Sequence, residues 1–245
     1  MLRTSNPALK ESTFRNLPRA LAGEAMTLQG TVNKTGISLL ILLAAASFVW
    51  NSEVVQPFIF IGLIGGLVTA LVTIFKNTAA PWTTPLYAAF EGLLLGGISK
   101  MFEMRYEGIV INAVALTFGT LAALLAVYST GLIRPSENFK LGLFAATGGI
   151  ALLYMVSMVL GFFGIRVPYI HDSSPIGIAF SVFVVIIAAL NLVLDFDFIE
   201  RGAAANAPKY MEWVGAFGLL VTLVWLYLEI LHLLAKLQGG GRDRR

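Results

Sequence analysis

Three carboxylates lie within stretches of sequence that are otherwise typical of lipid-facing helices. Glu91 lies in one apolar run, Asp195 near the end of another, and Glu229 in the last. An Asp at the middle of a membrane helix costs about 2.5 to 3.5 kcal/mol even on lenient insertion scales, so such residues are usually paired, hydrated or functional. We therefore expect the function of this protein to depend on these three acids.

The chemistry open to these acids is limited by the residues around them. The apolar segments contain no lysine or arginine, so we expect no basic side chain at the depth of the acids to neutralise them. Three arrangements remain: a carboxyl group kept protonated by desolvation, two carboxyl groups that share one proton, or carboxylates that coordinate a cation. Each arrangement makes the site depend on pH.

The composition indicates an integral membrane protein. Hydrophobic residues make up 57% of the 245 residues and charged residues only 13%, about half of the share in soluble proteins. The net charge of +3 comes without a basic face rich in aromatic residues, so we expect no nucleic-acid partner. The chain has no cysteine and lacks the HExxH, GxSxG and P-loop motifs, so we expect no enzyme and no resident cofactor.

Seven apolar segments follow a polar, basic tail of residues 1–33. Because a helix needs about 20 residues to cross about 30 Å of hydrocarbon, they predict an all-α, polytopic membrane bundle of seven transmembrane helices over residues 34–236. A Gly/Arg-rich tail occupies residues 237–245. The segments are 35–50, 57–75, 84–98, 109–128, 141–163, 175–198 and 213–234.

Glycines within these segments predict close packing between helices rather than phosphate binding. They are Gly62, Gly65, Gly66, Gly92, Gly96, Gly148 and Gly149.

The loop lysines and arginines predict a cytoplasmic N-terminus. In that orientation ten of them lie inside and seven outside. The basic C-terminal tail would fit better inside, which a re-entrant seventh segment would allow, but we expect seven full crossings.

Helix length gives the expected depth of each acid. At 1.5 Å per residue, Glu91 lies about 10 Å and Asp195 about 9 Å from the cytoplasmic edge, so the two are predicted to be able to meet. Asn191 precedes Asp195 by one turn and adds a neutral oxygen of the kind that calcium accepts. Glu229 lies about 24 Å along its helix, toward the outside, with His232 at i+3 on the same face.

Less specific interpretations of the same residues stay open. Asp197, a secondary candidate for the ion site, and Glu200 can be interfacial charges at a helix end. Glu229 and His232 can form a pair at the outer interface. Glu91 can be a protonated carboxyl group that hydrogen-bonds to a neighbouring helix.

Five segments together resemble the Bax inhibitor-1 family, in its bacterial branch with a longer polar N-terminal tail. Their order and spacing across the seven spans carry the resemblance. They are SNPAL, MTLQGTVNKTG, PWTTPLYAAFEGLLLGGIS, NLVLDFDFIERG and WLYLEILHLLAKL.

The resemblance implies a bacterial inner-membrane bundle with a central last helix, a pH-sensitive calcium leak and a link to suppression of cell death. The leak is attributed to two acids, which correspond here to Asp195 and Glu229, so these are the implied calcium ligands. Glu229 stands where the family has Asp, and His232 where Asn is common. Glu91 matches an acid found in some members. The depth estimates separate Asp195 from Glu229, so their direct pairing would need a kinked or deeper-starting seventh helix.

Two functions from different classes follow from this sequence. The first is a cation leak, with calcium the expected ion, in which protonation of the intramembrane carboxylates closes the pathway. The second is a non-transporting regulator or scaffold that binds other membrane proteins in stress or cell-death control. A proton-coupled transporter is a third possibility. The expected partners are the lipid bilayer, calcium or protons, and other membrane proteins.

Overall fold

The computed structural model describes residues 25–164 and 172–242, and this part of the chain is almost entirely helical. Within it, the only β contact is an isolated bridge between Ala25 and Pro208. The helices are α2 (Leu28–Trp50), α3 (Gln56–Phe75), the short 3-10 helix η1 (Asn77–Ala79), α4 (Ala80–Arg105), α5 (Ile109–Ser129), α6 (Glu137–Phe162), α7 (Pro175–Ala204) and α8 (Met211–Arg242).

Six of these helices are long and apolar enough to cross a membrane: all of the α-helices except α4. Four charged residues at positions 91, 100, 103 and 105 set α4 apart. At 26 residues α4 is nevertheless about 39 Å long, and it packs along α2, α3 and α8. The predicted bundle of seven membrane helices is confirmed.

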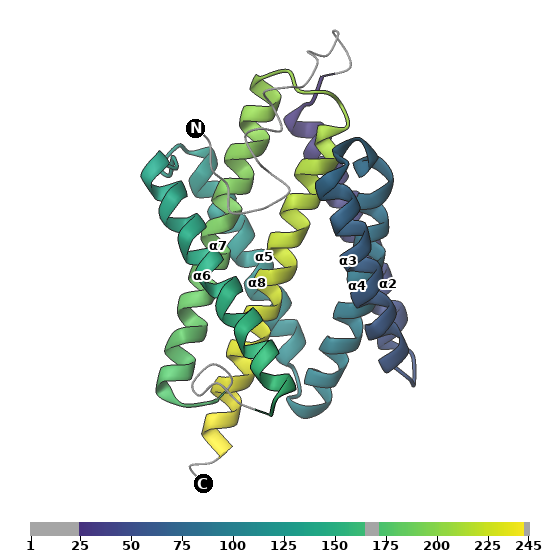
Figure 1. Cartoon of the computed structure of the whole chain (residues 1–245), viewed down its shortest axis with the longest axis vertical. Helices are drawn as coiled ribbons and strands as arrows, with labels where there is room; N and C mark the ends of the chain where they lie inside the picture. The colour runs from purple at the N-terminus through teal and green to yellow at the C-terminus, as the bar shows by residue number, and fades with distance from the viewer. Residues whose placement is uncertain (1–24, 165–171, 243–245) are drawn as a thin grey trace.

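Helix α8 lies at the centre of the bundle, with α2, α3 and α4 on one side and α5, α6 and α7 on the other (Figure 1). Its side chains are buried along most of its length, whereas α3 and α6 expose broad apolar faces. The predicted central position of the last helix is therefore confirmed.

Successive helices run in opposite directions, so the connections gather at two ends of the bundle (Figure 1). The end formed by residues 25–27, 76–79, 130–136 and 205–210 is called the Glu212 end. The opposite end, formed by residues 51–55, 106–108 and 172–174 and by the last turns of α8, is called the Lys236 end.

Glycines allow α4 to lie directly against α2. A Cβ atom at Gly92 would lie 2.3 Å from the backbone oxygen of Leu42, and one at Gly96 would lie 2.6 Å from that of Ala46. These contacts confirm the packing prediction for α4. The same prediction is wrong at positions 148 and 149 of α6, where a Cβ atom would have no neighbour within 4 Å.

Several helices begin earlier or end later than the apolar segments predict. Helix α2 begins at residue 28 and so includes Lys34, α6 begins at residue 137 and includes Lys140, and α8 continues past Lys236 to residue 242. Helix α2 therefore begins within the predicted tail of residues 1–33, of which residues 1–24 lie outside the described part of the chain. Hydropathy marks the apolar part of a helix, but its backbone hydrogen bonds continue into the polar membrane interface.

Candidate functional site

Asp195 lies in the most enclosed stretch of α7. Its side chain is completely buried, and every neighbour from Asn191 to Phe196 is at most 8% exposed. Helices α5, α6 and α8 all pack against α7 and enclose it. A carboxyl group is thus held within an apolar core, as the sequence predicts.

Asn191 faces α6 one turn away from Asp195. Its side-chain Nδ2 donates to the hydroxyl of Thr147 at 3.0 Å and to the backbone oxygen of Ile187 at 2.8 Å. These bonds orient the Asn191 amide and join α6 to α7.

Glu229 on α8 is buried against α6. The Tyr154 hydroxyl donates to its two carboxylate oxygens at 3.0 and 3.1 Å, and Trp225 Nε1 donates to one of them at 3.1 Å. Two donors, the Tyr154 hydroxyl in a bifurcated hydrogen bond and the Trp225 indole N–H, therefore hold a carboxylate inside the membrane-spanning part of the bundle.

A lysine lies on the same helix, two turns beyond Glu229. Lys236 is buried, and its ammonium group donates to the Ser181 hydroxyl at 2.8 Å and to the Gly177 backbone oxygen at 3.2 Å. It also interacts electrostatically with Glu229. By helix rise Lys236 lies about 10 Å beyond Glu229, so it is not at the depth of the acid. Because α8 extends beyond its apolar segment, it nevertheless adds a buried lysine that the apolar segments do not predict.

His232 is not part of the Glu229 site. Its side chain is exposed, and its Nδ1 lies 2.8 Å from the backbone oxygen of Leu228. Its ring packs edge-on against the ring of Phe102 on α4, with 5.4 Å between the two ring centroids. Glu229 bonds instead to α6. The prediction that the two residues form one site is wrong, because a spacing of three residues leaves them about 60° apart around the helix axis.

Glu91 does not meet Asp195. It lies where α4 approaches α3, so that a Cβ atom at Gly66 would be 3.0 Å from its carboxylate. Tyr87, one turn earlier on α4, interacts with the same carboxyl group. Helix α8 lies between α4 and α7 (Figure 1). The predicted pairing fails because equal depth does not make two side chains face each other.

Asp197 lies at the Glu212 end of α7 and binds two basic residues. Lys140 of α6, which is nearly buried, approaches it at 2.8 Å, and Arg201 approaches it at 3.0 Å. The neighbouring Glu200 accepts a hydrogen bond from the Tyr128 hydroxyl at 2.5 Å. These contacts fit the interpretation of Asp197 and Glu200 as interfacial charges.

Asp195 and Glu229 lie at different depths. The contacts of Lys236 with Gly177 and Ser181 fix the register of the antiparallel helices α7 and α8. In this register Lys236 lies opposite the middle of the segment 177–181, so Asp195 lies opposite residue 220 of α8. Residue 220 is nine residues from Glu229, which places Asp195 and Glu229 about 14 Å apart along the helix axis. The direct pair implied by the family resemblance is not formed. Among the described residues, no three His, Cys, Asp or Glu side chains group as a metal site.

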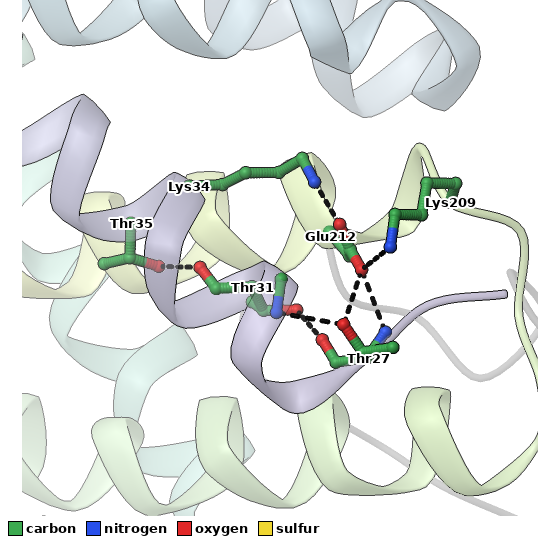
Figure 2. Close-up of polar contacts among 7 residues, drawn as sticks. Thr27, Thr31, Lys34, Thr35, Lys209 and Glu212 are labelled. Atoms are coloured by element: carbon green, nitrogen blue, oxygen red, sulfur yellow. Dashed lines mark hydrogen bonds and ion pairs between the residues drawn. The ribbon is translucent and has the colours of Figure 1, made fainter. Parts of the chain in front are cut away.

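A third buried acid among the described residues, Glu212 in the first turn of α8, is not predicted from the sequence. It is completely buried and binds four groups (Figure 2). One oxygen accepts from the Thr27 amide, the Thr27 hydroxyl and the Lys209 ammonium group, each at 2.9 Å. The other binds the ammonium group of Lys34. Since Glu212 directly precedes the last apolar segment, hydropathy alone assigns it to a loop.

The start of α2 is shaped to receive this carboxylate. Thr27 is the N-cap of α2, and its hydroxyl also accepts a hydrogen bond from the Gly30 amide (Figure 2). A Cβ atom at Gly30 would overlap the Glu212 carboxylate, so any larger residue there would displace the carboxylate from this position. The Met26 amide donates to the backbone oxygen of Ala207 at 2.6 Å. Helix α2 is thereby joined to the connection between α7 and α8.

Comparison with known proteins identifies one family. The family described as Bax inhibitor 1 like matches residues 6–239, nearly the whole chain. Searches of curated proteins and of solved structures found no match. The extent of the family match, together with the bundle around a central last helix, shows that this chain belongs to the Bax inhibitor 1 like family.

Proposed function

We propose that this protein is a pH-sensitive cation leak of the membrane, with calcium as the expected ion. The observation that carries the proposal is the placement of two buried carboxylates, Asp195 and Glu229, at separate depths on the central pair of helices α7 and α8. Family membership supports a membrane channel or regulator. The buried acids favour the channel.

The two acids would act in sequence on a cation that moves along α7 and α8. A carboxylate attracts a cation and replaces part of its hydration, and a protonated carboxyl group does so much less. Because the levels are about 14 Å apart, a cation would pass from one acid to the other rather than bind both at once. Protonation of either acid would then slow conduction.

Lys236 gives a reason for low conduction in the arrangement described here. Its buried ammonium group is held at the Lys236 end by Gly177 and Ser181. A fixed positive charge beside the proposed pathway opposes the passage of a divalent cation. Opening would therefore require Lys236 to move or to be neutralised.

The proposed orientation places the Glu212 end in the cytoplasm of a bacterial inner membrane. The basic side chains Lys34, Lys76, Arg134, Lys140 and Lys209 then face the cytoplasmic side, in agreement with the positive-inside rule.

Calcium flux into proteoliposomes, measured across a range of pH, tests the proposal. We expect flux from the wild-type protein to fall as the pH falls, and we expect both Asp195→Asn and Glu229→Gln to flatten this dependence. Glu107→Gln, which changes an exposed acid in the turn after α4, is the matched control and should behave as wild type.

An unchanged pH profile in Asp195→Asn would refute the role of this acid. An absence of wild-type flux at every pH would favour the alternative function, a regulator that binds other membrane proteins. That function predicts loss of the cellular phenotype on deletion of residues 1–24, which leaves Thr27 and Gly30 of the Glu212 site in place, but not on neutralisation of Glu91, Asp195 and Glu229 together.

A further inference from the structure

A groove lies between α2 and α5. Two cavities, of about 320 and 780 Å³, lie there and share Leu39 and Leu223 in their walls. Helices α2 and α5 both pack on α8 rather than on each other, so α8 forms the floor. The groove lies on a different face of α8 from the α6 contacts of Glu229.

Most of the larger cavity is apolar. Its walls include Leu28, Val32 and Leu39 of α2 and Leu121 and Leu125 of α5. From residue 28 to residue 39 the cavity extends about 17 Å along α2, close to half of the 30 Å hydrocarbon thickness. Its length and polarity therefore match the acyl chains of one membrane leaflet.

The larger cavity ends at the Glu212 end, in charged side chains. Arg201 there is already paired with Asp197, which also binds Lys140, and Glu200 is bonded to Tyr128. Arg134 also lines the cavity. It is exposed, and among the residues described here it forms no ion pair.

Arg134 therefore brings a positive charge to the polar end of an apolar groove. Guanidinium groups bind phosphate through paired hydrogen bonds, and Arg134 lies in the short connection before α6, where lipid headgroups would lie. The charged end of the groove thus matches the phosphate headgroup of a phospholipid, and its apolar part matches the acyl chains.

We infer that this groove binds one glycerophospholipid from the leaflet at the Glu212 end. Its phosphate contacts Arg134, and its acyl chains lie between α2 and α5 as far as Leu39 and Leu223. The site is distinct from the proposed cation pathway, so its test is independent of any leak.

The groove offers a matched pair of blocking variants. Gly36 of α2 lines the larger cavity, and nothing lies within 4 Å of a Cβ atom there. Gly119 of α5 is equally unobstructed but lies outside both cavities. Gly36→Trp should fill the groove, while Gly119→Trp adds the same side chain elsewhere on the lipid-facing surface.

A second pair tests the headgroup contact. Arg134→Gln removes the positive charge from the groove, and Lys76→Gln removes one from an exposed position at the same end of the bundle. Native mass spectrometry of the full chain in detergent would count bound lipid during titration with phosphatidylglycerol, and with diacylglycerol, which lacks the phosphate.

We expect the wild type to hold one phosphatidylglycerol molecule. Gly36→Trp should abolish this binding and Gly119→Trp should retain it. Arg134→Gln should weaken phosphatidylglycerol binding about tenfold and leave diacylglycerol binding unchanged, whereas Lys76→Gln should change neither.

Three results would overturn the inference. They are no retained lipid in the wild type, equal binding by Gly36→Trp and Gly119→Trp, or an equal effect of Arg134→Gln on both lipids. The first would be the result if another part of this chain filled the groove. Thermal unfolding of each variant separates a loss of binding from a loss of fold.

Discussion

The carboxylate of Glu212 on α8 is bound by the ammonium group of Lys34 on α2, although the two residues are 178 positions apart in the sequence. The first and last helices of the described bundle are thus joined directly. Lys34 also lies over the ring of Trp213, with its ammonium group 5.6 Å from the ring centroid. This contact lies at the Glu212 end, away from Glu229.

Glu212→Gln should destabilise the bundle, because it removes the negative charge bound by Lys34 and Lys209. Because the side chains of Lys34 and Lys209 are 17% and 51% exposed, this loss costs about 1 to 2 kcal/mol, which corresponds to a decrease in Tm of about 2 to 8 °C. Thermal unfolding in detergent measures this change. Glu53→Gln, in the exposed connection after α2, is the control, and equal Tm values for the two variants would contradict the prediction.

Tyr154→Phe should move the midpoint of the leak's pH dependence to higher pH. The tyrosine hydroxyl donates to both oxygens of Glu229, and a donor of this kind favours the charged carboxylate. Without it, Glu229 protonates more readily and conduction falls at a higher pH. Calcium flux measured at a series of pH values gives the midpoint. Tyr106→Phe at the end of α4 should leave it in place, and a downward shift in Tyr154→Phe would refute the argument.

Lys236→Met should increase calcium flux severalfold at neutral pH. Methionine keeps most of the length of the side chain but removes the buried charge that opposes a cation. Lys100→Met is the control, since Lys100 lies toward the same end of the bundle and donates to the backbone oxygen of Trp50 at 3.0 Å. A flux no greater than that of the control would show that Lys236 does not limit conduction.

Gly92→Ala and Gly148→Ala should have opposite effects on stability. The added methyl group at Gly92 would overlap the backbone of α2, at a cost of about 1 to 3 kcal/mol. The same change at Gly148 meets open space and should stabilise α6 by about 0.5 to 1 kcal/mol, because alanine restricts the unfolded chain more than glycine does. Unfolding in detergent compares the two, and similar losses at both positions would be the contrary result.

The number and order of the helices could be predicted from the sequence because apolar runs of membrane length are a strong signal. The depth of Glu229 could also be predicted, since depth needs only a starting residue and a fixed rise per residue. The direction of each side chain could not. Glu91 faces α3, His232 faces α4 and Glu229 faces α6, and these differences depend on helix packing that periodicity does not encode.

The positions of the lysines could not be predicted from hydropathy alone. Lys34, Lys140 and Lys236 all lie in helical turns beyond the apolar segments, and each binds a group on another helix. The segment MTLQGTVNKTG carries part of the family resemblance, and it holds Thr27, Gly30 and Lys34, which contribute to the Glu212 site. The sequence alone does not show that these three residues contact Glu212.

The contact between α2 and α8 also constrains how the protein is made. Glu212 is synthesised 178 residues after Lys34, which is about 9 to 36 seconds later at a translation rate of about 5 to 20 residues per second. During this interval Gly92 and Gly96 can already hold α4 against α2. Lys34 at the start of α2 has no Glu212 carboxylate to bind during this interval, and the contact between α2 and α8 forms only after the start of α8 has left the ribosome.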